Sequence, residues 1–209
     1  MSTISPDRPV RSLASWWRSL HEPVAGVSVW TRRAALAIPL VVLPSSIWRI
    51  VTVVFLPLPD GMTTDEASGD LPTWFPLEVY VLVLSLVSEG LALLCVGLIT
   101  RWGEVWPRWV PVLRGRRIPV AVALVPALLG ATILTALWGW AGVSFLLGRT
   151  VQGERLPDDS PLQLDSLDGA VVFVCYAPLM LWGPLLFAVA LAYWRRRSVT
   201  WTQRPSSAP

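Results

Sequence analysis

Residues 118–147, IPVAVALVPALLGATILTALWGWAGVSFLL, form an apolar run without a single charged residue. A bilayer core about 30 Å thick is crossed by roughly 20 apolar residues in a helix, so this run is long enough to span it. An ordinary helix of a soluble core is shorter, and the run lacks the strict alternation of a membrane β-strand. The run therefore predicts a transmembrane helix.

Three more runs of the same kind occupy residues 34–56, 77–99 and 170–194. Prolines interrupt several of them, which membrane helices tolerate better than soluble helices do. Hydrophobic residues make up 54% of the chain, and its mean hydropathy is +0.56. We predict an all-α fold, a four-helix transmembrane bundle over residues 34–194.

The polar segments that separate these runs alternate in the sign of their charge. Arginine dominates residues 1–33, the link 100–117 and the tail 195–209, whereas Asp and Glu dominate the links 57–76 and 148–169. Basic residues stay on the cytoplasmic side of a membrane. We therefore expect a multi-pass protein of the cell (plasma) membrane, with both termini in the cytoplasm and both acidic links outside. The second acidic link still carries Arg149 and Arg155.

The N-terminal segment 1–33 contains a short amphipathic pattern. Leu13, Trp16, Trp17 and Leu20 fall on one face of a helix that Ser12 can cap. This pattern predicts a short interfacial helix on the inner leaflet. The alternative is a disordered tail in which the tryptophans are incidental.

The link 100–117 has the densest local pattern of the chain: Trp102-Gly103-Glu104, Pro107-Arg108-Trp109 and Gly115-Arg116-Arg117-Ile118-Pro119. Over residues 100–140 the chain resembles a group of uncharacterised four-span membrane proteins common in actinobacteria. The resemblance implies a cell-membrane protein of a high-GC bacterium and carries no activity. General membrane-protein roles explain the same residues: Arg sets the orientation, Trp anchors the chain at the interface, and Gly and Pro form a tight turn into the third span. The alternative is a loop that docks a cytoplasmic partner or an anionic lipid headgroup.

Two charged residues, Arg49 and Glu89, lie well inside the apolar runs. An ionisable group in the membrane is costly and is by default a candidate functional residue. Helical spacing places other polar residues on the same faces: Ser45 and Thr52 with Arg49, and Glu78 and Ser85 with Glu89. Because consecutive spans are antiparallel, we expect these two polar stripes to face each other instead of lipid.

Depth decides how Arg49 and Glu89 can interact. A rise of 1.5 Å per residue places Glu89 about 8 Å deeper than Arg49, so a direct ion pair needs helix tilt or the reach of the Arg side chain. In a structural interpretation, Arg49 extends outward to Glu78 or to headgroups, and a protonated Glu89 bonds a neighbouring span. In a functional interpretation, Arg49 and Glu89 line a transport path or a ligand site. Both interpretations stay open.

Small residues recur at every fourth position of the third run, at Ala127, Ala131, Thr135 and Gly139. This pattern allows two helices to approach closely, either within the bundle or between copies of the chain.

Signatures of catalysis, metal binding and nucleotide binding are missing from the sequence. His21 is the sole histidine, and the chain has neither a Cys-x-x-Cys motif nor a Gly-rich phosphate loop. The arginines flank membrane spans, so anionic headgroups are nearer partners than nucleic acid. We expect no enzymatic activity and no cofactor.

The sequence favours a small, non-enzymatic integral membrane protein that serves as a subunit or accessory of a membrane complex. Its expected partners are the lipid bilayer and another membrane protein or a second copy of the chain. The alternative is a small transporter or channel component with Arg49 and Glu89 in a polar intramembrane path.

Overall fold

The computed structural model describes residues 24, 26–56, 72, 74–100, 103, 118–155 and 167–202. Its elements in chain order are α2 (Val29–Ile50), η1 (Val51–Phe55), α4 (Leu77–Val96), η2 (Gly97–Ile99), α5 (Val120–Leu146), α6 (Leu167–Tyr176), η4 (Ala177–Leu181) and α7 (Trp182–Thr202). Four helical stretches are long and apolar enough to cross a membrane: Val29–Phe55, Leu77–Ile99, Val120–Leu146 and Leu167–Ser198. The predicted all-α fold with four transmembrane helices is confirmed. The predicted interfacial helix lies outside the described residues.

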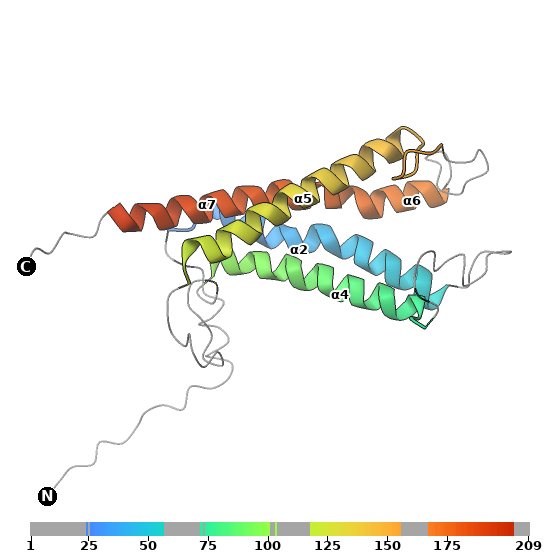
Figure 1. Ribbon diagram of the computed structural model, residues 1–209, viewed down its shortest axis with the longest axis horizontal. Helices are drawn as coiled ribbons and strands as arrows, with labels where there is room; N and C mark the ends of the chain where they lie inside the picture. The colour runs from blue at the N-terminus through green and yellow to red at the C-terminus, as the bar shows by residue number, and fades with distance from the viewer. Residues whose placement is uncertain are drawn as a thin grey trace, which may run out of the picture.

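The four spans run antiparallel to one another along the chain (Figure 1). α2 and α7 pack against each other in the middle, α4 packs against α2, and α5 packs against α7. In the described part of the chain, no extensive contact joins α4 to α5. The helices therefore form an open arrangement in the order α4, α2, α7, α5, and the two outer helices each leave a face uncovered.

One end of the bundle gathers the start of α2, the end of α4, the start of α5 and the end of α7 (Figure 1). Three hydrogen bonds join these ends: Val24 N to Ile99 O (3.1 Å), Arg196 Nη2 to Leu98 O (3.2 Å) and Arg197 Nη2 to Ile118 O (2.7 Å). Leu98 lies in the last turn of the second span, where carbonyls have no donor within the helix, and Arg196 supplies one. Arg32 and Arg33 near the start of α2 and Arg195, Arg196 and Arg197 in α7 therefore lie at the same end of the bundle.

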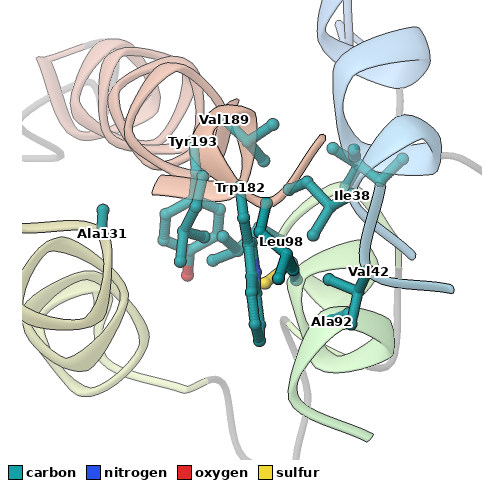
Figure 2. Packing of buried hydrophobic residues seen from close by; sticks show 13 residues of the cluster. Ile38, Val42, Ala92, Leu98, Ala131, Trp182, Val189 and Tyr193 are labelled. Carbon is teal, nitrogen blue, oxygen red and sulfur yellow. The ribbon is translucent and has the colours of Figure 1, made fainter. Parts of the chain in front are cut away.

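The core lies where the four spans approach one another, and two large side chains of α7 fill it (Figure 2). Trp182 and Tyr193 are 5% and 2% exposed. Around them pack Ile38 and Val42 of α2, Ala92 of α4 and Ala131 of α5. Between helices in lipid, packing of this kind replaces the hydrophobic effect as the source of association.

Hydroxyl side chains bond carbonyls of their own helix in the outer half of α2, next to its prolines. Pro39 and Pro44 lie inside this helix, and each lacks the N–H that would bond the carbonyl four residues earlier. The Ser45 hydroxyl donates to Val42 O at 2.8 Å, and the Thr52 hydroxyl donates to Trp48 O at 2.9 Å. The carbonyls that the prolines leave without a backbone donor are those of Ala35 and Leu40, so neither hydroxyl bond replaces a bond that the prolines remove.

Two helix boundaries differ from the expected runs. α2 begins at Val29 instead of residue 34, because the Ser28 hydroxyl caps the helix by accepting from Thr31 N at 3.1 Å. The fourth span begins at Leu167, changes to the 3₁₀ turn η4 at Pro178 and continues to Thr202. A proline cannot donate to the α-helical ladder, which accounts for the change.

Candidate functional site

Arg49 lies in the last turn of α2 and is half-buried. Its Nη2 donates to Ser46 Oγ at 3.5 Å, and its Nε is buried without a hydrogen-bond partner among the described residues. Ser46 lies one turn before Arg49, so the hydrogen bond between them lies along the helix itself.

Glu89 lies in the middle of α4, at the border between its packed and its uncovered face. Ser85 and Ala92, one turn to either side, are 2% and 0% exposed, whereas Leu86 and Leu93 are 72% and 57% exposed. The Oε1 atom of Glu89 is buried and has no hydrogen-bond partner in the described part of the chain. A buried polar atom without a partner carries a large desolvation cost. The Oε1 atom of Glu89 is therefore an unsatisfied hydrogen-bond acceptor.

Arg49 and Glu89 do not form an ion pair in this structure. No carboxylate oxygen of the described residues lies within 4.0 Å of the Arg49 guanidinium, so Glu78 does not pair with it either. Glu89 lies about 18 Å from the start of α4 at Leu77, whereas Arg49 lies about 9 Å from the end of the first span at Phe55. The two residues therefore differ in depth by roughly 9 Å, close to the expected offset. Their functional role stays a prediction.

The other predicted polar residues lie in three environments. Ser45 and Ser85 are buried at 0% and 2% exposure. Thr52 is part-buried and bonds only its own helix, at Trp48 O and Arg49 O. Glu78 is exposed in the first turn of α4. Ser45, Ser85 and Glu89 thus lie on packed or partly packed faces of α2 and α4, and Glu78 lies apart from them.

Sequence reasoning missed a cavity of about 410 Å³ between the last turns of α5, the loop that follows it and the fourth span around α6 and η4. Two aromatic pairs line it: Trp138 with Tyr176, ring centroids 6.1 Å apart, and Phe145 with Phe173, 5.8 Å apart. Arg149 lines the cavity at the end where α5 stops. The available signals were the aromatic residues at helical spacing and the two arginines of an otherwise acidic link.

Among the described residues, no group of three or more His, Cys, Asp or Glu side chains could hold a metal ion. Cys95 and Cys175 are both free thiols, so these residues do not bridge the second and fourth spans. The arrangement around Glu89 can accept a hydrogen bond or a proton, and the cavity can accept an apolar group.

Comparisons of the chain with protein-family models, with curated proteins and with solved structures found no match. The resemblance to actinobacterial membrane proteins stays a prediction. The interpretation of the role therefore rests on the geometry of Glu89, the open helix arrangement and the cavity.

Proposed function

We propose that this protein is a non-enzymatic integral membrane protein that works as a subunit or accessory by associating with another membrane protein. The observation that carries the proposal is Glu89, whose buried Oε1 lacks a donor among the described residues beside the uncovered face of α4. A polar group in the hydrocarbon region is rarely left to lipid and usually faces another helix. Glu89 as a whole is only part-buried, so a donor from a neighbouring chain would reach its carboxyl group from the uncovered face, at the oxygen other than Oε1.

The position of α4 supports this proposal. α4 is an end helix of the open arrangement and packs against α2 with one side only. Its uncovered side carries large apolar residues, among them Leu86 and Leu93. A second helix placed there would bury these side chains and bring a hydrogen-bond donor to Glu89. Side-chain hydrogen bonds across helices contribute about 1–2 kcal/mol in membranes.

Site-specific cross-linking tests the proposal. A photoreactive amino acid in place of Leu86, one turn from Glu89, should yield a cross-linked species of discrete size in native membranes. The same group in place of Leu129, which is 60% exposed on α5, is the matched control and should yield none. A species of twice the chain mass would identify the partner as a second copy, and another mass would indicate a different protein.

Substitutions at Glu89 make the test specific. Glu89→Leu should weaken the cross-link about tenfold, because the lost polar contact is worth about 1.4 kcal/mol. Glu89→Gln should retain it, because the amide can still hydrogen-bond. Equal cross-linking from the Leu86 and Leu129 positions, or a cross-link that survives Glu89→Leu, would contradict the proposal.

A second candidate function is a component of a small transporter or channel. It is favoured by three buried polar atoms of α2 and α4 that have no partner among the described residues: Arg49 Nε, Ser85 Oγ and Glu89 Oε1. Water that satisfied these atoms would form a polar path along the two helices. In such a path Glu89 would be the group that binds and releases a cation or proton.

The proposed location is the plasma membrane, with the arginine-rich end of the bundle in the cytoplasm. Arg32 and Arg33 near the start of α2 and Arg195, Arg196 and Arg197 in α7 support this orientation. Basic residues near span ends are retained on the cytoplasmic side.

A further inference from the structure

We propose that the cavity between α5 and the fourth span holds one acyl chain of an anionic phospholipid, whose phosphate is bound by Arg149 and Arg155. This site is separate from Glu89, and the inference does not depend on the proposed association. Three features carry it: the apolar walls and depth of the cavity, the placement of Arg149 at its mouth, and the opposition of two arginines.

The cavity matches the depth of one leaflet. Its walls include Trp138, Phe145, Phe173 and Met180, and its volume of about 410 Å³ falls within the usual range for small-molecule sites. The lining from Trp138 to the end of α5 at Leu146 extends about 12 Å along the helix, most of the depth of one leaflet in a hydrocarbon core about 30 Å thick. A lipid chain that entered from the leaflet at this end of the bundle would therefore fit along its length.

The end of α5 holds Arg149 at the mouth of the cavity. Gly148 adopts a φ of 63°, and the N–H groups of Gly148 and Arg149 donate to Phe145 O at 3.0 Å and Ser144 O at 2.9 Å. These bonds form a Schellman motif, in which glycine is favoured because the position requires a left-handed backbone. The next residues are tied back to α5 by Trp140, whose Nε1 donates to Val151 O at 2.9 Å.

The turn that follows places a second arginine opposite the first. Thr150 N donates to Glu154 O at 2.8 Å, and Arg149 and Arg155 form an isolated antiparallel bridge. Like charges directly opposite each other across such a bridge are destabilising. Both side chains are exposed, and no carboxylate of the described residues lies within 4.0 Å of either guanidinium.

Two general effects, the helix dipole and the preference of arginine for the cytoplasmic side of a membrane, do not fully explain why Arg149 and Arg155 lie opposite each other. A cation after the C-terminus of α5 is favoured by the helix dipole, which explains Arg149. The dipole does not explain Arg155, and the preference for basic residues in the cytoplasm disfavours both arginines in this link. A bound phosphate would relieve the repulsion, because arginine donates paired hydrogen bonds to phosphate oxygens. A ligand that places a phosphate beside Arg149 and Arg155 and an acyl chain in the cavity is a phospholipid.

Photolabelling of the full chain in vesicles tests this inference. The probe is phosphatidylglycerol with a diazirine in one acyl chain, present at low fraction in phosphatidylcholine, and labelled peptides are mapped by mass spectrometry. Labels should concentrate on residues 138–145 and 172–180. Labelling should fall when unlabelled phosphatidylglycerol replaces part of the bulk phosphatidylcholine. It should not fall when the replacement is phosphatidylcholine with the same acyl chains as that phosphatidylglycerol.

Variants separate headgroup binding from chain binding. The double substitution Arg149→Gln and Arg155→Gln should lower labelling about tenfold, because it removes the charge-assisted bonds to phosphate. Arg32→Gln removes one charge at the other end of the bundle and should change nothing. Ala141→Phe narrows the cavity and should lower labelling, whereas Ala136→Phe, on an exposed part of α5 outside the cavity lining, is the matched control.

Three results would overturn the inference. They are equal competition by phosphatidylcholine, labels spread over all uncovered helix faces, and undiminished labelling in the double arginine variant. The arginine variant decides the question even if Ala141→Phe does not fold, because both arginine side chains are exposed and neither contributes to the core.

Discussion

Arg49 and Glu89 differ in how easily their side chains can reach water or lipid headgroups from inside the membrane. Arg49 lies six residues before the end of the first span at Phe55, where a long side chain can extend toward the headgroups. Glu89 lies about 18 Å from the start of α4, too deep for a short side chain to reach water. Glu89 is therefore the residue whose environment calls for a partner, a proton or a water molecule.

Substitution of these two residues separates a structural role from transport. Glu89→Gln should leave thermal stability in detergent within about 1 kcal/mol of the parent chain, because an amide can replace the hydrogen bonds of a carboxyl group. Arg49→Ala should lower the stability by about 1–2 kcal/mol, since it removes a part-buried polar contact. Both variants should leave cation flux in reconstituted vesicles unchanged. If Glu89→Gln abolished a cation flux of the parent chain and kept its thermal stability, the result would favour a transport function over association with another membrane protein.

At the scale of helices, the sequence predicted the elements well and their ends less well. An apolar run long enough to cross a bilayer specifies a span without any tertiary contact, and all four spans were predicted on that ground. The start of α2 at Val29 depends on a single hydroxyl cap, and the turn η4 depends on how the fourth span bends at Pro178. The cavity depends on the separation of α5 from α6, which no periodicity within one helix encodes.

The small-residue pattern of α5 has a partner that was not predicted. Gly183, near the start of α7, lies against the α5 backbone: a Cβ added there would lie 2.6 Å from Thr135 N and 2.8 Å from Ala131 O. Small residues permit such close approach of two membrane helices. The pattern at Ala131 and Thr135 therefore serves packing within the bundle.

Gly183→Leu should lower the free energy of unfolding by about 1–3 kcal/mol or more, because the new side chain forces α7 away from α5. Gly183→Ala should also destabilise, since two of the three obstructing atoms, Thr135 N and Ala131 O, belong to the backbone and cannot rotate away. Gly139→Ala is the control, because a Cβ there meets nothing within 4 Å. Thermal unfolding in detergent measures all three. Equal effects at the two glycines would contradict close packing of α5 against α7 at Gly183.

At the scale of the whole molecule, charge and packing divide the bundle into two distinct ends. One end holds Arg32 and Arg33 at the start of α2 and the arginines of α7, and hydrogen bonds from Arg196 and Arg197 join the helix ends there. The opposite end holds the cavity, with Arg149 and Arg155 beside it. If the first end faces the cytoplasm, the lipid that enters the cavity comes from the outer leaflet.

Cysteine accessibility tests the orientation of the whole bundle. In a chain with Cys95 and Cys175 replaced by Ser, Asp65→Cys and Gln152→Cys should react with a membrane-impermeant maleimide in intact cells. Ser198→Cys, exposed at the opposite end of the bundle, should react only after permeabilisation. The arginine asymmetry requires this pattern, because basic segments at span ends are not translocated readily. The reverse pattern would place the termini outside and assign the lipid site to the inner leaflet, where anionic phospholipids would be bound from the cytoplasmic side.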